Sequence, residues 1–245
     1  MQYEHIKTGI FLERPNRFIA LVQLGKDIVT CHVKNTGRCK ELLIPGTRVL
    51  VQYHPHAEAL GRKTHYSLIS VYKICEKKEP LLINMDSQAP NQAALEWLSG
   101  MTLIKHIRRE IPFGSSRFDL AFEYDGKPCY MEVKGVTLEE HGIARFPDAP
   151  TLRGLKHVEE LTAMAKDGLS CFLLFVIQMK PVICFEPNIK THPEFGPALS
   201  IAHEAGVRIL AFDCLITENS MTIDSPIPIY LPGLSAPLTA SKKGI

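Results

Sequence analysis

The chain has 245 residues, of which 45% are hydrophobic and 22% are charged. This length and composition suit one large folded domain or two small ones, and they exclude a mostly disordered chain. No apolar run reaches the ~18 residues of a membrane span, and the N-terminus lacks the basic and apolar stretches of a secretion signal, so we expect a cytoplasmic protein without a membrane partner.

The charge is uneven along the chain. Residues 1–80 hold 13 Lys and Arg against 7 Asp and Glu, whereas the remaining residues hold 15 against 19. A basic N-terminal third is typical of a phosphate-binding module, although a solvated basic surface would give the same count. The seven cysteines are odd in number and lack paired close spacings, which predicts free thiols in a reducing compartment.

The first part of the chain alternates short apolar runs with turn residues. We expect strands at 18–24, 28–33, 48–53 and 66–72, separated by Gly25-Lys26-Asp27, Pro45-Gly46 and Gly61. Several short strands in a basic segment favour an OB-like β-barrel that binds nucleic acid. We place this domain at residues 1–82.

Helical spacing begins near Gln92. A helix is expected there, followed by a hairpin over 117–136, a helix over about 152–166, an apolar strand over 170–178, a helix over about 197–205 and a strand over 208–212. This order predicts an α/β or α+β domain with a mixed sheet over residues 83–231. Residues 232–245 are expected to form an irregular tail.

The hairpin contains the most informative pattern. Asp125-Gly126 lies between two alternating runs and predicts a two-residue type I′ turn that pairs Tyr124 with Lys127. That register places Asp119 opposite Glu132 and Arg117 opposite Lys134 on one face. The other face is expected to be wholly apolar and to carry Phe118, Leu120, Phe122, Cys129, Met131 and Val133.

Two opposed carboxylates repel each other when both are ionised. A hard divalent cation between Asp119 and Glu132 would relieve this, so we expect a Mg²⁺ or Mn²⁺ site, with Lys134 close to a scissile phosphate. Without metal, Glu132→Gln is expected to leave the fold equally or more stable. The structural alternative is an ordinary salt-bridged surface of Asp119 and Glu132 with Arg117 and Lys134.

The spacing D-x₁₂-E-x-K between two helices resembles the core of the PD-(D/E)XK nucleases, with Phe118 in place of proline before Asp119. Pro147-Asp148 forms a second proline–aspartate pair, but the stretch after it is helical and has no E-x-K on a strand. The resemblance implies catalytic roles for Asp119, Glu132 and Lys134. Arg117 and an upstream acidic group, Glu110 or the less favoured Glu96, are further candidates.

Five segments resemble the sugar fermentation stimulation protein A family: HVKNTGR (32–38), ELLIPG (41–46), FGSSRFD (113–119), MEVKGVTL (131–138) and FPDAPTLRGLKH (146–157). The resemblance runs from about residue 11 to residue 213. It implies a DNA-binding protein with an OB-like N-terminal domain and a PD-(D/E)XK-like C-terminal domain. It supports fold and DNA binding better than it supports catalysis.

Basic and aromatic side chains are candidates for nucleic-acid contact. They are Arg14, Arg17, Phe18, His32, Asn35 and Arg38 in the N-terminal domain, and Arg153 and His157 on the helix after the hairpin, whose N-cap we expect at Thr151. Phe18 could equally be a core residue. Arg153 and His157 could equally lie on an exposed helix face that does not contact nucleic acid.

Two functions remain open from the sequence. One is a Mg²⁺- or Mn²⁺-dependent phosphodiester-cleaving enzyme, and the other is a non-catalytic DNA-binding or regulatory protein that keeps a relic nuclease site. The intact Asp119, Glu132 and Lys134 favour the enzyme. The residues do not distinguish DNA from RNA or single strands from duplex, and they give no oligomeric state.

Overall fold

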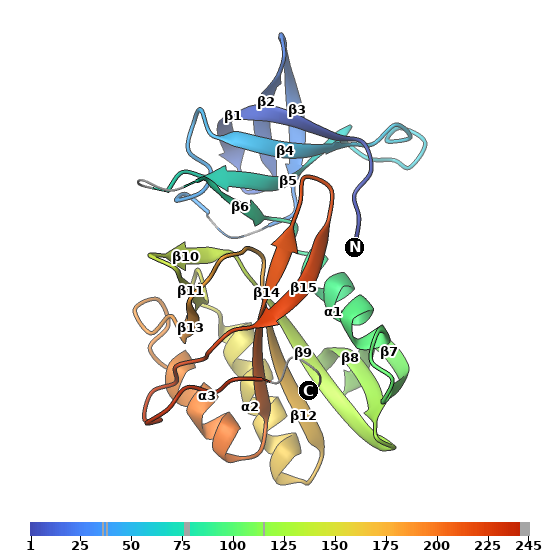
Figure 1. The fold of residues 1–245 in the computed structure, drawn as a ribbon. Helices are drawn as coiled ribbons and strands as arrows, with labels where there is room; N and C mark the ends of the chain where they lie inside the picture. Colours follow the sequence, from blue (N-terminus) through green and yellow to red (C-terminus); the bar gives the residue numbers. More distant parts are fainter. Residues whose placement is uncertain (36, 38, 76–78, 115, 241–245) are drawn as a thin grey trace.

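The computed structural model describes residues 1–35, 37, 39–75, 79–114 and 116–240. Two domains are stacked one above the other, an all-β N-terminal domain and an α/β C-terminal domain (Figure 1). Arg38, expected to contact nucleic acid, lies outside the described residues. All seven cysteines are free, as predicted.

The N-terminal domain is a closed five-stranded barrel of the OB type. Parallel pairing of β3 with β5 closes the sheet, and β6 adds to the outer edge of β5. Alternate side chains point inward, so that Ala20 and Val22 on β2 are fully buried. The strands are β1 (Ile6–Asn16), β2 (Ile19–Leu24), β3 (Asp27–Val33), β4 (Arg48–Tyr53), β5 (Tyr66–Lys73) and β6 (Leu81–Asn84).

The C-terminal domain is built on a six-stranded mixed sheet in the order β15-β14-β12-β9-β8-β7. β12 runs parallel to β9 and β14, and the outer strands pair antiparallel. The strands are β7 (Ile104–Phe113), β8 (Ser116–Tyr124), β9 (Lys127–Val136), β12 (Ser170–Ile177), β14 (Arg208–Ile216) and β15 (Met221–Pro226). The sheet confirms the expected mixed α/β class.

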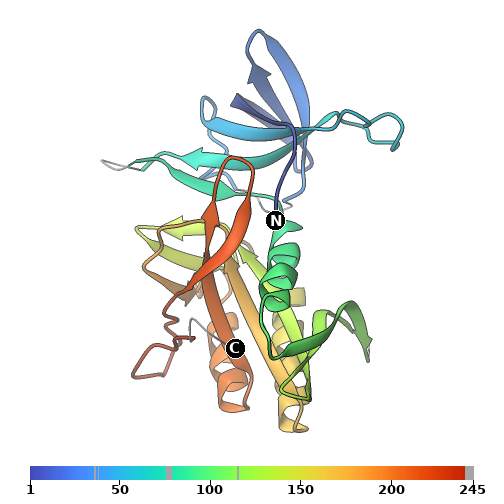
Figure 2. The same ribbon diagram turned by 45° about the vertical axis from the view of Figure 1, so that its right-hand side comes forward.

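Helices cover both faces of this sheet (Figure 2). The helix α1 (Ala89–Ser99) packs on one face, and α2 (Leu152–Lys166) and α3 (Phe195–Glu204) pack on the other. A small second sheet lies beside α2 and α3, with strands β10 (Leu138–Glu140), β11 (Ile143–Phe146) and β13 (Cys184–Pro187). Among the described residues, no helix combines the length and apolar character needed to cross a membrane.

Several strands were not predicted. The pattern near Gln92 predicts a helix running on to Ile104, but α1 ends at Ser99 and the edge strand β7 begins at Ile104. Edge strands bury little of either face, so β7 is mostly exposed and its sequence shows no clean alternation. The strands β1, β6 and β15 and the three strands of the small second sheet were missed as well.

The two domains are joined by charged and polar contacts. Lys34 of the barrel pairs with the buried Asp86 at 2.6 Å, and Lys73 pairs with Glu139 at 2.5 Å. The buried amide of Gln178, at the end of β12, donates to the backbone carbonyls of Asn84 and Asp86. Burial makes these bonds costly to break, which favours a fixed domain arrangement.

Candidate metal centre and nucleic-acid interface

The β8–β9 hairpin has the predicted register. Asp125 and Gly126 adopt positive φ angles of 49° and 75°, and the ladder pairs Tyr124 with Lys127 and Leu120 with Met131. The described ladder ends at the Leu120–Met131 pair, so the predicted pairs Asp119–Glu132 and Arg117–Lys134 are not part of it. Beyond it, Asp119 Oδ2 accepts a hydrogen bond from the backbone N–H of Val133 at 2.8 Å. A side chain thus replaces the next backbone bond of the ladder.

Phe118 lies on the other face of the hairpin from the one predicted, whereas the remaining apolar residues lie where they were expected. Leu120 and Val133 pack in the core cluster under α1, as do the other predicted members of this face. Phe118 instead joins the cluster on the α2 side, with its ring centroid 6.3 Å from that of His157. The prediction was wrong here, because β8 pairs with β9 only from Leu120 onward. The part of β8 before Leu120 pairs with β7 alone, and there the Phe118 ring turns toward α2.

Asp119 is held on the α1 side of the hairpin. Asn91 Nδ2, in the first turn of α1, donates to its Oδ1 at 2.7 Å. Burial and the charge of Glu132 raise the pKa of Asp119 from 3.8 to about 6, although the hydrogen bonds from Val133 and Asn91 and the charge of Lys134 act in the opposite direction. The ionised form of Asp119 is therefore under electrostatic strain.

Glu132 is only 3% exposed, and its two oxygens have different surroundings. Oε1 accepts a hydrogen bond from Lys134 Nζ at 2.5 Å and another from His157 Nδ1. Burial alone would raise the pKa of Glu132, but the His157 and Lys134 contacts outweigh it and lower the pKa. A carboxylate can only accept, so Nδ1 of His157 carries the proton. Oε2 is buried and has no hydrogen-bond partner among the described residues.

These features fit a hard divalent cation. A buried acceptor oxygen without a donor and a strained neighbouring carboxylate are both relieved by positive charge. Mg²⁺ binds through one or two carboxylates and keeps several waters, so two side chains suffice. Within the described part of the chain, no group of three His, Cys, Asp or Glu side chains gathers as a metal site. The protein can thus supply Asp119 and Glu132, with the remaining ligands coming from water or substrate.

The other predicted catalytic groups lie at the edge of the sheet. Glu110 falls between the pairs Arg109–Leu120 and Ile111–Phe118 of the β7–β8 ladder, so its place is across from Asp119. Its half-exposed carboxylate pairs with Arg117 at 3.1 Å. Glu96 pairs with the N-terminal amine of Met1 at 2.5 Å. Neither upstream carboxylate completes a group of three with Asp119 and Glu132 among the described residues.

The helix α2 brings His157 to the site. Thr151 is its N-cap, as predicted, and the Thr151 hydroxyl accepts from Gly154 N–H at 3.0 Å. His157 lies one turn further along and is buried against Glu132, whereas Arg153 is exposed. The two residues thus separate into a buried group that contacts Glu132 and an exposed cation one helical turn before it.

The predicted nucleic-acid-binding residues of the barrel also divide into residues that hold the loop together and residues exposed on the surface. Arg14 donates to the backbone carbonyls of Arg17, Asn35 and Gly37, so it shapes the loop. The guanidinium of Arg17 lies 4.7 Å from the ring centroid of Phe18, which is 43% exposed and is not a core residue. A cation stacked on an exposed ring is a surface suited to phosphate and base.

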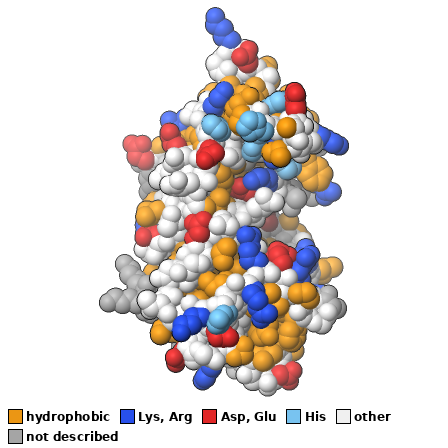
Figure 3. Space-filling view, turned by 90° about the vertical axis from the view of Figure 1, so that its right-hand side faces the viewer, with side chains coloured by type: hydrophobic (Ala, Val, Ile, Leu, Met, Phe, Trp, Pro, Cys, Tyr) orange, Lys and Arg blue, Asp and Glu red, His pale blue; other side chains and the backbone are white. Residues whose placement is uncertain are grey.

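His32 and Asn35 are partly buried. Burial, together with the charges of Arg62 and Lys34, lowers the pKa of His32. Asn35 Oδ1 accepts from Gly37 N–H at 2.8 Å, which folds the loop back on itself. Figure 3 shows basic side chains on both domains of the face that carries α1 and β7, with acidic groups between them.

The sequence analysis missed Asn91 and the basic edge strand. Asn91 could have been found only through the contact of α1 with β8, which no local pattern encodes. Lys105, Arg108 and Arg109 are exposed on β7, next to the candidate site. Their charges are visible in the sequence, but the expected helix ended at Ile104 and no strand was predicted before residue 117.

Comparison with known proteins identifies the family. Residues 12–77 match the model of the SfsA N-terminal OB domain, and residues 88–220 match that of the sugar fermentation stimulation protein RE domain. A sugar fermentation stimulation protein homolog of Desulfitobacterium hafniense (strain Y51) is 50% identical over 233 residues, covering 94% of this chain and 99% of that protein. The homolog of Clostridium beijerinckii is 47% identical over 234 residues, covering 94% and 100%.

A solved structure agrees with this assignment. The structure of Pyrococcus furiosus SfsA in complex with Ca²⁺ is 28% identical and covers 94% of this chain and 98% of that one, with a TM-score of 0.81. Both domains are therefore shared with a solved relative. The chain belongs to the sugar fermentation stimulation protein family.

Proposed function

We propose that this protein is a DNA-binding nuclease that cleaves phosphodiester bonds with Mg²⁺ or Mn²⁺ held by Asp119 and Glu132. The observation that carries the proposal is the buried Oε2 of Glu132, which has no donor among the described residues and lies beside a second carboxylate whose pKa is raised to about 6. Such a pair is costly in a protein that does not use it. The Pyrococcus relative was solved with Ca²⁺, which is also an oxygen-binding ion.

Each neighbouring side chain has a role in this proposal. A bound divalent cation polarises a phosphoryl oxygen and lowers the pKa of the attacking water. His157 and the backbone N–H of Val133 fix the two carboxylates, so that little reorganisation is needed. Lys134 is the nearby cation that offsets negative charge developing on the phosphoryl group.

The N-terminal barrel supplies the proposed binding surface. Its segment has the basic excess, and the Arg17–Phe18 stack is exposed on it. OB barrels commonly bind nucleic acid through such basic and aromatic surfaces. DNA is the proposed partner, and RNA and single strands are compared with it in the assay.

A second candidate is a non-catalytic DNA-binding or regulatory protein. One contact favours it: Oε1 of Glu132 is already satisfied by Lys134 and His157, as in a structural ion pair. In such a protein the carboxylates only repel phosphate. Glu132→Gln would then tighten DNA binding, and no cleavage by the wild type would exist to lose.

The test is a cleavage assay on labelled single- and double-stranded DNA and on RNA. Wild-type protein is incubated with Mg²⁺, with Mn²⁺ or with EDTA, and is compared with Asp119→Ala and with Asp167→Ala. Asp167 is an exposed aspartate at the C-terminal end of α2 and serves as the matched control. We expect metal-dependent cleavage by the wild type and the control, and a loss of at least about 100-fold in Asp119→Ala.

Cleavage that persists in EDTA, or that is equal in Asp119→Ala, would overturn the proposed site. Absence of cleavage on every substrate, together with tighter DNA binding by Glu132→Gln, would establish the binding protein instead.

A further inference from the structure

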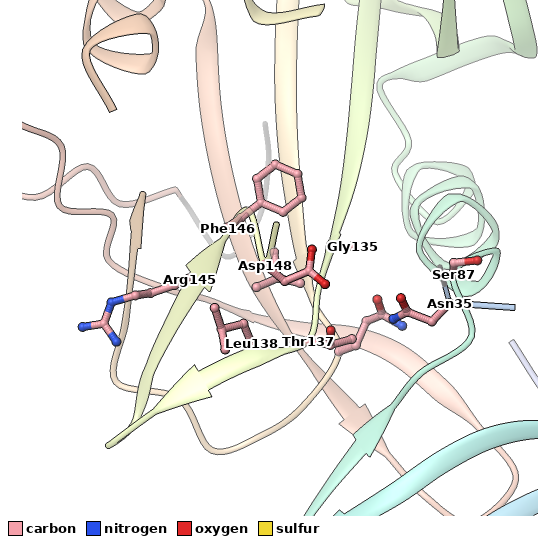
Figure 4. A pocket seen from close by; sticks show the side chains of 10 residues that line it. Asn35, Ser87, Gly135, Thr137, Leu138, Arg145, Phe146 and Asp148 are labelled. Atoms are coloured by element: carbon pink, nitrogen blue, oxygen red, sulfur yellow. The ribbon is translucent and has the colours of Figure 1, made fainter. Parts of the chain in front are cut away.

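A cavity of about 120 Å³ lies where the two domains meet (Figure 4). One water molecule needs about 10–15 Å³ of such space, so a group of several heavy atoms fits. The wall is formed by the barrel loop, the linker, the end of β9, β11 with the loop after it, and the end of β12. The lining residues are Asn35, Ser87, 135–138, 145–146, Asp148 and Gln178.

The segments that carry the family resemblance converge on this cavity. Asn35 comes from HVKNTGR, Gly135 and Thr137 come from MEVKGVTL, and Asp148 comes from FPDAPTLRGLKH. The metal centre uses only part of these segments. Asp148 in particular lies outside it, and no role in the proposed cleavage accounts for it.

Glycines keep this junction tight. A Cβ at position 37 would lie 2.1 Å from Asp148 Oδ2, and one at position 135 would lie 2.5 Å from Gln178 Oε1. The barrel loop therefore approaches Asp148 so closely that a side chain at position 37 would have to displace the Asp148 carboxylate. Asp148 is an exposed residue, and its carboxylate lies at the point where the two domains touch.

Several hydrogen-bond donors of the cavity wall already have partners: the Ser87 hydroxyl donates to the backbone carbonyl of Lys34, and the Gln178 amide donates to those of Asn84 and Asp86. No hydrogen bond or ion pair is found for the Asp148 carboxylate in the part of the chain that the structure describes, and Figure 4 shows it pointing toward Gly135. Arg145 lines the cavity, but its guanidinium pairs with Glu140 and Glu186 and points away from Asp148. An anion such as a phosphate is thus disfavoured, and a ligand that presents donors is favoured.

The cavity adjoins the metal centre. Gly135 directly follows Lys134, and a Cβ at Gly135 would lie 2.7 Å from Cγ of Pro90 in the first turn of α1. The next residue, Asn91, donates to Asp119. A nucleic-acid strand whose phosphate reaches Lys134 would therefore bring a neighbouring base to the cavity.

We propose that this cavity takes a single unpaired guanine base of the nucleic-acid substrate, with the Asp148 carboxylate accepting hydrogen bonds from the guanine N1–H and N2–H₂ groups. The proposal rests on the proposed function and specifies its substrate. Guanine presents two adjacent donors on its Watson–Crick edge, which match the two oxygens of a carboxylate. Thymine and uracil present one donor between two acceptors, which the carboxylate repels. The ring of Phe146 supplies an aromatic wall.

The test measures binding in EDTA, so that it does not depend on cleavage. Fluorescent thymidine oligomers carry either no substitution, one central guanine or one central inosine, which lacks the N2 amine. We expect the wild type to bind the guanine oligomer about 10-fold more tightly than the all-thymidine oligomer, with inosine between them. Asp148→Asn, which keeps the size of the side chain, should remove the preference, because guanine loses its acceptor and thymine is no longer repelled, so that all-thymidine binding stays equal or becomes tighter. Asp167→Asn, an equal charge change on the exposed end of α2, should keep the preference.

Equal binding of the three oligomers by the wild type overturns the proposal, as does an unchanged guanine preference in Asp148→Asn. The inosine comparison uses only wild-type protein and decides the question even if a variant fails to fold. A guanine preference without metal-dependent cleavage supports the cavity and contradicts the proposed nuclease function. Metal-dependent cleavage without a guanine preference supports the proposed nuclease function and contradicts the proposed base-binding cavity.

Discussion

Asp119 and Glu132 are neighbours with opposite electrostatic situations. Glu132 is stabilised as a carboxylate by His157 and Lys134, whereas Asp119 has two uncharged donors and faces the charge of Glu132. The repulsion expected between the pair therefore falls on Asp119. This asymmetry gives separate expectations for the two residues.

Asp119→Asn should stabilise the metal-free protein at neutral pH. The folded-state pKa is raised from 3.8 to about 6, so folding disfavours the ionised form. This cost is absent well below pH 3.8 and fully present above about pH 6, where it reaches about 3 kcal/mol. Denaturant unfolding at several pH values should show a gain for the variant near pH 7 that shrinks as the pH falls toward 4. A gain that is equal at all pH values would contradict this expectation.

The same variant should lose its response to metal. Mg²⁺ at about 100 times its dissociation constant stabilises a single-site protein by about 2.7 kcal/mol. We expect the melting temperature of the wild type to rise with Mg²⁺ and that of Asp119→Asn to stay nearly constant. Asp167→Asn is the control and should respond like the wild type.

Neutralising Glu132 should have the opposite effect on stability. The sequence predicts that Glu132→Gln relieves repulsion and leaves the metal-free fold equally or more stable. The contacts of Glu132 with Lys134 and His157 lead us to expect a loss of stability instead. The variant leaves the largely buried Lys134 without its anion and weakens the bond from His157, at a cost of about 2 kcal/mol. Chemical denaturation in EDTA measures it. If Glu132→Gln equals or exceeds the wild type in stability, the described ion pair contributes nothing.

At the scale of elements, the close contact between α1, β9 and β12 depends on Gly135. An added Cβ would lie 2.5 Å from Gln178 Oε1 and 2.7 Å from Pro90 Cγ. Gly135→Ala should therefore displace the Gln178 side chain and the start of α1, and cost about 1–3 kcal/mol. Thermal unfolding measures the loss, and cleavage should fall because α1 also carries Asn91.

Gly100→Ala is the matched control. Gly100 is the C-cap of α1 with φ −79°, and its nearest neighbour to an added Cβ lies at 3.5 Å. Alanine fits there without strain, so stability should stay within about 0.5 kcal/mol of the wild type. Equal losses in both variants would show that the contacts around Gly135 are not special.

At the scale of the whole molecule, the proposed nucleic-acid-binding surface and the proposed cleavage site lie on different domains. If Arg17 contacts a phosphate, Arg17→Ala should reduce the slope of log K against log salt by about 1. Arg153→Ala changes one exposed cation in the first turn of α2 and tests the other domain in the same way. Fluorescence titrations of one DNA at several salt concentrations give both slopes. A change only in Arg153→Ala would move the main contact surface to the C-terminal domain.

The sequence by itself determined the parts of this protein that depend on local patterns. The Asp125-Gly126 turn and the period of two specified the hairpin register as far as Leu120 and Met131. The N-cap at Thr151 and the spacing of apolar residues specified α2, and the quoted segments specified the family and its OB barrel. Turn chemistry, capping and side-chain period act over a few residues, so these features can be predicted from a single chain.

Only the tertiary structure decided how the site is assembled. The turn of Phe118 toward α2 depends on where β8 leaves β9. The contact of His157 with Glu132, the bond from Asn91 to Asp119 and the meeting of Asn35 with Asp148 at one cavity all join segments far apart in the sequence. Edge strands such as β7 bury too little to leave an alternating pattern. These features follow from packing between distant elements, which local periodicity does not encode.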